Sequence, residues 1–166
     1  LAEAESERLE DYPNLNAFFS RRLKPSLRIQ PNDESVWTSP ADGRLTQFGE
    51  ISEGTIIQAK GLNYTVANLL DNDYATADKF KTGSFGCVYL APHNYHRVHM
   101  PSGGTLCAAR YVPGELFSVN ETTTKYIDNL FCRNERVILI FEKETDYFAV
   151  VMVGACLVGG IAITLP

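Results

Sequence analysis

From residue 35 onward, the sequence alternates between short segments rich in Val, Ile, Thr and aromatic residues and turns that contain glycine. β-Branched and aromatic residues favour strands, and glycine ends a strand or allows a tight turn. This pattern predicts a mainly β fold with helices near the N-terminus, of the α+β class. The predicted strands are residues 43–48, 55–60, 86–91, 105–112, 136–142, 147–153 and 157–164.

Helical patterns are few and short. Residues 2–10 are predicted as a helix or the end of one, and residues 14–25 as a second helix. Asn14 or Asn16 can cap that second helix, and Pro25 would end it. Two further segments are predicted as short helical turns, residues 65–71 and 126–131.

The length of 166 residues is enough for one domain with its own hydrophobic core and too short for two comfortable ones. We therefore expect a single domain over residues 1–166, made of a helical segment (1–25) and a β domain (35–166). The net charge of −5 argues against nucleic-acid binding, since proteins that bind a phosphate backbone are usually basic.

The four cysteines do not form a disulfide or zinc pattern, because none of them belongs to a C-x-x-C pair. Three of them adjoin apolar runs. We interpret all four as buried small hydrophobic residues, which indicates a reducing compartment. They are Cys87, Cys107, Cys132 and Cys156.

Residues 147–166 carry no charge and are long enough to cross a bilayer as a helix. Gly154, Gly159 and Gly160 interrupt this segment, and Val and Ile dominate it, so buried strands are favoured over a transmembrane span. The N-terminal residues are acidic and contain no apolar stretch typical of a secretory signal.

The segment "FFSRRLKP" (residues 18–25) places two phenylalanines beside three basic residues. One interpretation is a helix that packs on the core through Phe18 and Phe19, with its cations in water. The other is a membrane-surface contact, in which aromatic rings enter the headgroup layer and cations meet anionic lipid. The sequence leaves both open.

All three histidines, His93, His96 and His99, lie in one short window between Pro92 and Pro101. The spacing H-x-x-H-x-x-H does not favour a metal site: successive positions change faces in a strand, and the prolines oppose a helix. The window also contains no Asp, Glu or Cys to complete a ligand shell. We expect no metal.

Acid–base chemistry is the other use for this window. A catalytic histidine needs a carboxylate that orients it, and Asp42 in the turn "SPADGRL" is the candidate. The alternative is that Asp42 only stabilises its own turn and that the histidines are ordinary polar residues. No Gly-x-Ser-x-Gly motif supplies a nucleophile, so the residues alone leave these alternatives open.

Six blocks occur in a characteristic order and spacing: "SPADGRL", "QAKGLNYTVANLL", "VYLAPHNYHRVHMP", "YVPGELFSVN", "LFCRNERV" and "VGACLVGGI". Taken together, they resemble the bacterial-type phosphatidylserine decarboxylase family, a family of pyruvoyl-dependent proenzymes. The N-terminal "FFSRRLKP" also matches this family, and the resemblance covers residues 12–163.

The resemblance implies an antiparallel, barrel-sandwich-like sheet core and a carboxy-lyase that makes its own cofactor. In such proenzymes a serine attacks the preceding carbonyl, the chain is cut, and the new N-terminus of the small α chain becomes a covalent pyruvoyl group, derived from the serine as a bound pyruvate. By motif match, Asp42 orients His99, and His99 is the base that activates the serine. His96 matches the histidine used in decarboxylation, where it positions the substrate carboxylate or supplies the proton. Phe117 and Ser118 are weaker candidates for contact with the substrate, and ordinary strand packing is the alternative for both.

The resemblance also implies partners and a location. The partners would be the pyruvoyl-bearing α chain, the substrate phosphatidylserine, which is converted to phosphatidylethanolamine, and a membrane surface. A homo-oligomer is expected, and nucleic acid is not. The protein would be peripheral on the inner (cytoplasmic) membrane.

The sequence departs from the family at one important place: the family's cleavage motif, typically Leu-Gly-Ser-Thr, does not occur. The only Gly-Ser pair, Gly83-Ser84, precedes a predicted strand and does not match the scissile bond. We therefore expect the pyruvoyl-forming serine beyond Pro166, with this chain as the larger (β) part of the enzyme, incomplete at its C-terminus. The alternative is a catalytically inactive, lipid-binding homologue that never forms the pyruvoyl group.

Overall fold

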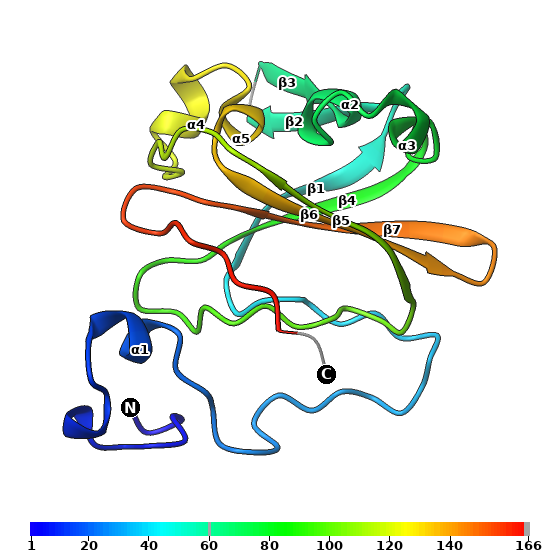
Figure 1. Cartoon of the computed structure of the whole chain (residues 1–166). Helices are drawn as coiled ribbons and strands as arrows, with labels where there is room; N and C mark the ends of the chain where they lie inside the picture. The colour runs from blue at the N-terminus through cyan, green and yellow to red at the C-terminus, as the bar shows by residue number, and fades with distance from the viewer. Residues whose placement is uncertain (60, 165–166) are drawn as a thin grey trace. The chain divides into compact units, whose positions relative to one another are not determined.

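The computed structural model of the chain describes residues 1–59 and 61–164 (Figure 1). The chain divides into two compact units. The first unit comprises Leu1–Thr46 and Val88–Gly103, and the second comprises Gln47–Cys87 and Gly104–Pro166. The histidine window therefore belongs with the N-terminal residues and not with the strands that flank it. The single domain over residues 1–166 stays a prediction.

The first unit has little regular structure apart from a 3₁₀ turn, η1 (Leu9–Asp11), and a short helix, α1 (Leu15–Phe19). Of the two predicted caps, Asn14 is the one that caps α1, since its side chain accepts a hydrogen bond from the Ala17 N–H at 2.9 Å. The helix ends at Phe19 instead of continuing toward Pro25.

The helix predicted over residues 2–10 is wrong. Ala4 and Leu23 form an isolated antiparallel bridge instead. The Glu5 N–H donates to the Arg22 carbonyl oxygen, and the Lys24 N–H donates to the Glu3 carbonyl oxygen, both at 2.9 Å. This pairing with a distant segment satisfies backbone groups that a helix would have used locally.

The second unit holds two antiparallel sheets. Strands β2 (Thr55–Ala59) and β3 (Leu62–Thr65) form a hairpin, and β5 (Thr105–Val112), β6 (Arg136–Lys143) and β7 (Asp146–Val153) form a three-stranded sheet in that order. A further two-stranded sheet consists of β1 (Arg44–Ile51) and β4 (Gly83–Tyr89). The α+β, mainly β class is confirmed.

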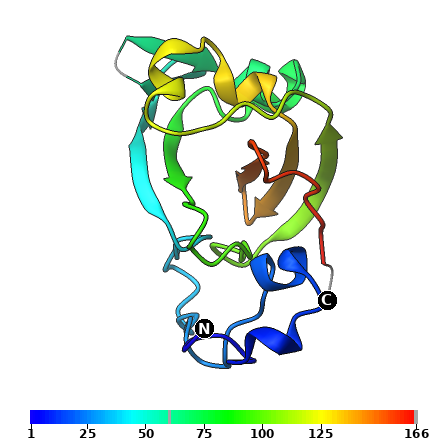
Figure 2. The same cartoon turned by 90° about the vertical axis from the view of Figure 1, so that its left-hand side faces the viewer.

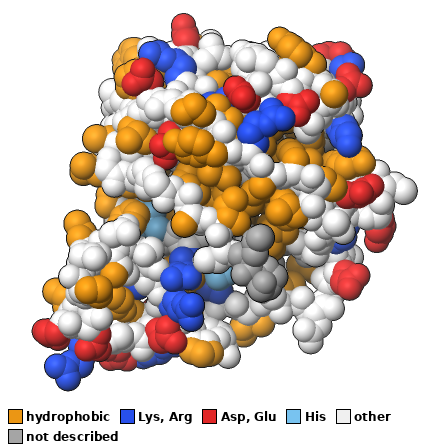
Figure 3. Space-filling view, in the orientation of Figure 1, with side chains coloured by type: hydrophobic (Ala, Val, Ile, Leu, Met, Phe, Trp, Pro, Cys, Tyr) orange, Lys and Arg blue, Asp and Glu red, His pale blue; other side chains and the backbone are white. Residues whose placement is uncertain are grey.

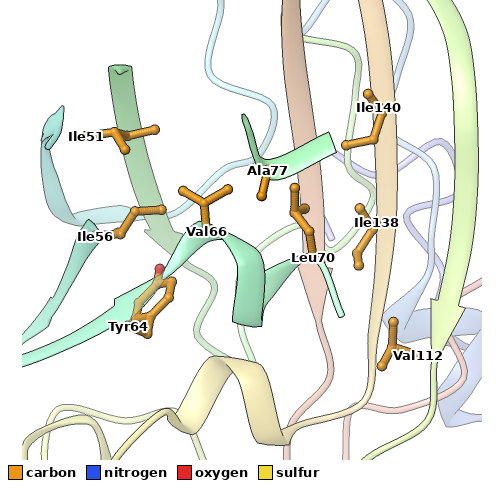
Figure 4. Packing of buried hydrophobic residues seen from close by; sticks show 9 residues of the cluster. All are labelled: Ile51, Ile56, Tyr64, Val66, Leu70, Ala77, Val112, Ile138 and Ile140. Carbon is orange, nitrogen blue, oxygen red and sulfur yellow. The ribbon is translucent and has the colours of Figure 1, made fainter. Parts of the chain in front are cut away.

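The centre of the second unit is β6, which is covered on both faces. Its side chains alternate between two hydrophobic clusters, as the two-residue period of a strand requires. Ile138 and Ile140 point into the first cluster (Figure 4), whereas Val137, Leu139 and Phe141 belong to the second, where Phe141 stacks on Phe148 of β7. This double coverage explains why residues 136–141 are all buried.

Four short helices complete the second unit: α2 (Val66–Leu69), α3 (Tyr74–Asp78), α4 (Thr123–Tyr126) and α5 (Leu130–Arg133). Helix α2 contacts β3, α3 and α5, and α4 contacts β2, so these helices gather beside the β2–β3 hairpin (Figures 1 and 2). Every helix in the described part of the chain has at most five residues, too few for a transmembrane span.

Most of the predicted strands are confirmed, with ends that differ by a few residues, but the strand at 157–164 is wrong. Ala155 and Val158 close a tight turn through two mutual hydrogen bonds of 2.8 Å. Leu157 and Gly160 have φ values of 67° and 71°, which are incompatible with a strand. In the predicted strand 55–60, residue 60 lies outside the described residues.

The helical turn predicted over residues 126–131 is confirmed only in part, because it overlaps the end of α4 at Tyr126 and the start of α5 at Leu130 and Phe131. Asn129, with φ of 54°, separates the two helices. Strand β3 and helix α3 were not predicted at all.

The interpretation of all four cysteines as buried is wrong for two of them. All four are free thiols, but Cys107 on β5 and Cys156 are exposed, whereas Cys87 and Cys132 are half-buried. Burial raises the pKa of the Cys132 thiol to about 11.

Candidate active site

Two stretches of the first unit run side by side and bring Asp42 near His99. The Thr38 N–H donates to the Pro101 carbonyl oxygen at 2.9 Å, and the His99 N–H donates to the Pro40 carbonyl oxygen at 2.8 Å. These bonds align the Asp42 turn with the end of the histidine window, although the two segments are far apart in the sequence.

The glycine that follows Asp42 is required by a close backbone approach. A Cβ atom at Gly43 would lie 2.4 Å from the Tyr89 carbonyl oxygen and 2.8 Å from the Val88 side chain. No side chain fits in that space, so the Asp-Gly pair lets the end of β4 pass directly beside the turn that carries the carboxylate.

The hydrogen-bond partner of the Asp42 carboxylate, among the described residues, is Arg28. The Arg28 Nε donates to both carboxylate oxygens, at 2.9 and 2.8 Å, and its Nη2 donates to one of them as well. Nη2 also pairs with Glu3 at 3.1 Å. These hydrogen bonds lower the pKa of Asp42 below its ordinary value, with a smaller contribution from the charge of Arg28 and then of His99. Asp42 is therefore a carboxylate at neutral pH.

The His99 imidazole is exposed, and its Nε2 lies 2.9 Å from the hydroxyl of the buried Tyr95. The two rings stack with centroids 5.5 Å apart. The sequence predicts that Asp42 orients His99. In the structure the Tyr95 hydroxyl contacts the His99 ring, and the charge of His99 contributes to the lowered pKa of Asp42.

His96 has a different environment. Its Nδ1 lies 2.9 Å from the Asn94 carbonyl oxygen and must carry the proton, because a carbonyl only accepts. The Phe19 ring covers the imidazole, with centroids 3.8 Å apart. Burial lowers the pKa of His96, and the charges of Arg21 and His93 lower it further. At neutral pH His96 is uncharged, with its lone pair on Nε2.

His93, which the motif match leaves without a role, is exposed.

Phe117 and Ser118 belong to the second unit, whereas Asp42, His96 and His99 all belong to the first. The Phe117 backbone is held by the buried Asn134, which accepts from its N–H at 3.0 Å and donates to its carbonyl oxygen at 2.8 Å. The Ser118 hydroxyl accepts from the Asn120 side chain at 3.0 Å.

Sequence reasoning missed Arg28 and Tyr95. Arg28 lies in a stretch with no recognisable pattern. Tyr95 stands four residues before His99, inside the histidine window, and this position could have drawn attention to it. Within residues 1–59 and 61–164, no cluster of three or more His, Cys, Asp or Glu side chains could hold a metal ion.

Comparison with known proteins relates residues 15–166 to a family model described as phosphatidylserine decarboxylase. The chain is 48% identical over 162 residues to the phosphatidylserine decarboxylase proenzyme of Alcanivorax borkumensis, covering 97% of this chain and 56% of that protein. It is 46% identical over 165 residues to the proenzyme of the same name from Marinobacter nauticus, covering 99% of this chain and 57% of that protein. The chain thus spans little more than half the length of these relatives.

Proposed function

The chain belongs to the phosphatidylserine decarboxylase family, and from this premise we propose that it is the larger (β) part of a pyruvoyl-dependent enzyme. The enzyme converts phosphatidylserine to phosphatidylethanolamine after cutting its own chain. One observation carries the proposal. An ionised Asp42 and an exposed His99 lie on two irregular segments that backbone hydrogen bonds hold together.

In self-cleavage, His99 takes the proton from a serine hydroxyl as the serine oxygen attacks the preceding carbonyl carbon. The serine belongs to residues outside this chain. The negative charge of Asp42 stabilises the imidazolium that forms, which is the part a carboxylate plays in a serine–histidine–aspartate triad. The exposure of His99 supports this role, since an incoming hydroxyl can reach the ring.

Tyr95 imposes a condition on this step. Its hydroxyl occupies Nε2 of His99 in this chain, so a serine that uses Nε2 must displace the Tyr95 hydroxyl. Until it does, Tyr95 keeps the imidazole in a fixed orientation.

A pyruvoyl group supplies the electron sink for the loss of CO₂ from the substrate, and this chain supplies the proton transfer. Because Nδ1–H of His96 is bonded to the Asn94 carbonyl oxygen, Nε2 is the nitrogen that can exchange a proton with the substrate. Because His96 is uncharged at neutral pH, Nε2 must first take up a proton from water. The lowered pKa then makes this imidazolium a stronger acid, which favours delivery of the proton to the carbon that has lost CO₂. This supports proton delivery over binding of the substrate carboxylate as the role of His96.

Intact-mass measurement of the full-length protein tests this division of labour. We expect the wild-type protein to give two fragments, the smaller one reacting with hydroxylamine at its pyruvoyl terminus. His99→Ala and Asp42→Ala should slow self-cleavage by about 1,000-fold or more, the scale seen when a triad member is lost. His96→Ala should cleave normally but lower kcat by about 100-fold or more.

His93→Ala is the matched control, because His93 is an exposed histidine of the same window, and it should cleave and turn over like wild type. Equal processing in all four variants would contradict the assignment. A wild-type protein that stays in one piece would instead support an inactive, lipid-binding homologue.

The proposal includes a peripheral position on the inner membrane and a homo-oligomeric assembly. In the first unit, Leu15 and Ile29 are 79% and 80% exposed, which supports a surface that meets lipid. Phe18 and Phe19 do not contribute to that surface in full, because they pack against Tyr12 and His96. Sedimentation with vesicles and light scattering would test these two points.

A further inference from the structure

The first unit contains a pocket of about 300 Å³ that adjoins the candidate active site. This volume is at the lower end of the roughly 300–1,000 Å³ typical of small-molecule sites. Figure 3 shows Lys and Arg side chains beside histidine side chains on the face in view. The polar residues that matter here are Arg22, Lys24, Arg28, Tyr95, Arg97 and His99.

The cations of this pocket differ in how far they are already neutralised. Lys24 pairs with Glu7, and Arg28 pairs with Glu3 and Asp42. Arg22 and Arg97, in contrast, form no ion pair with any carboxylate in the described part of the chain. The pocket thus presents two guanidinium groups whose charge no side chain of the described residues offsets.

The backbone fixes the guanidinium of Arg97 and the main chain of Arg22. The Arg97 Nε donates to the Ser20 carbonyl oxygen at 2.8 Å, which leaves its two terminal nitrogens for a ligand. The Arg22 carbonyl oxygen accepts from the Glu5 N–H at 2.9 Å, within the Ala4–Leu23 bridge. A planar guanidinium held as that of Arg97 is suited to two parallel hydrogen bonds to a phosphate oxygen pair, and the exposed Arg22 adds a second positive charge at the same pocket.

We propose that this pocket binds a phosphate-type monoanion through Arg22 and Arg97 and that, in the enzyme proposed above, the anion is the phosphodiester of the phospholipid headgroup. This assignment rests on the proposed function. The headgroup of phosphatidylserine also carries a carboxylate, but that group leaves as CO₂. Two guanidinium groups bound to it would stabilise the ground state more than the transition state and oppose its loss. The phosphodiester does not change during the reaction, so binding it holds the substrate beside His99 at no such cost.

The test uses the purified full-length protein, with Arg22→Gln, Arg97→Gln and the double variant. Each single variant should raise KM for phosphatidylserine in mixed micelles about tenfold with little change in kcat, the scale of losing a hydrogen bond to a charged group. Arg8→Gln is the matched control: Arg8 is an exposed arginine of the same unit that pairs with Glu10 and does not line the pocket, so KM should stay unchanged.

A second readout does not depend on activity. Titration with inorganic phosphate should shift the arginine side-chain Nε–H resonances of Arg22 and Arg97 in NMR spectra, and the shifts should weaken at high salt. Melting temperatures of the variants within a few degrees of wild type would exclude a merely structural effect. Arg22→Lys should bind phosphate more tightly than Arg22→Gln but less tightly than wild type, because lysine keeps the positive charge and lacks the paired donors of a guanidinium.

The outcomes separate the two proposals. Phosphate-dependent shifts together with the KM increase support the headgroup assignment. Shifts that disappear in the variants while KM stays unchanged overturn the headgroup assignment and leave a site for free phosphate. If the protein turns over phosphatidylserine normally and shows neither the phosphate-dependent shifts nor the KM increase, the pocket proposal is overturned and the proposed enzymatic function is not. Shifts in a protein that never cuts its chain would overturn the proposed function and not the anion site.

Discussion

The carboxylate of Asp42 carries the charge on which the candidate site depends, and Arg28 controls that charge. Arg28 contacts both carboxylate oxygens of Asp42, and its Nη2 also donates to Glu3. Because one arginine bridges two carboxylates, the position of Asp42 depends on a residue near the N-terminus. Arg28 is in this sense a positioning residue for the site.

Replacing Arg28 should raise the pKa of Asp42. In Arg28→Gln we expect this pKa to move up toward the ordinary value of 3.8, because the hydrogen bonds that lower it are lost. The Asp42 pKa is lower in the folded than in the unfolded protein. The pair therefore stabilises the fold fully above the unfolded value, and its contribution is lost as pH falls through the folded one.

NMR titration of the Asp42 carboxyl carbon measures this shift. Lys24→Gln, which breaks the neighbouring Lys24–Glu7 pair instead, is the control and should leave the Asp42 titration as in wild type. An unchanged titration in Arg28→Gln would contradict the assignment of Arg28 as the cause.

His96 offers a second prediction at this scale, because Phe19 covers its ring. Phe19→Ala should expose the imidazole and raise its pKa toward the ordinary value of 6.5. In wild type the lowered pKa means that His96 stabilises the fold fully above the unfolded value, and this contribution is lost as pH falls through the folded pKa. The variant should therefore lose less stability between neutral and mildly acidic pH.

The ring-proton titration of His96 measures the pKa directly. Phe18→Ala is the comparison, since Phe18 packs on Tyr12 and should affect His96 much less. If both variants shift the pKa equally, the charge of Arg21, and not the covering ring, would be the main cause.

Among the structural elements, the loop that carries Phe117 and Ser118 depends on one buried side chain. Asn134, the residue that follows α5, bonds both backbone groups of Phe117 and also donates to the Gly154 carbonyl oxygen at 2.8 Å, beyond the end of β7. A single amide thus ties three segments of the second unit together.

Asn134→Ala should leave three backbone groups, one buried and two partly buried, without this partner and lower the free energy of unfolding by about 3 kcal/mol. Asn120→Ala, which removes an exposed amide from the same loop, should cost only about 1 kcal/mol. Urea denaturation of the two variants measures the difference. Equal costs would show that the loop is not held through Asn134.

At the scale of the whole molecule, the stability of the second unit depends on the double-sided burial of β6. Ile140 is 5% exposed within the first hydrophobic cluster, whereas Ile57 on β2 is 50% exposed. We expect Ile140→Ala to lower the free energy of unfolding by about 2–5 kcal/mol, because the transfer free energy is lost and a cavity remains. Ile57→Ala should cost less than about 1 kcal/mol, and the denaturation midpoints of both variants test this.

The two units also differ in what they contribute. The three proposed catalytic residues lie in the first unit, which has little regular structure, and the main hydrophobic clusters lie in the second. The proposed catalytic residues therefore lie apart from the two hydrophobic clusters. Backbone hydrogen bonds and ion pairs between distant segments hold them in place. This is consistent with the few regular hydrophobic patterns in residues 1–35.

Local patterns in the sequence were enough to predict the mainly β class, the strands at 105–112, 136–142 and 147–153, and the Asn14 cap, because each depends on side-chain period or on groups a few residues apart. The motif blocks were likewise enough to indicate the family. The hydrogen bonds of Asp42 with Arg28 and of Asn134 with Phe117, and the bridge between Ala4 and Leu23, follow no local rule. Each joins residues that become neighbours only in the folded protein. For the same reason, residues 2–10, predicted as a helix, form a bridge with a distant segment instead. The physical reason is that backbone sterics and burial period act over short separations, whereas the partners of buried and charged groups are set by which segments meet in three dimensions.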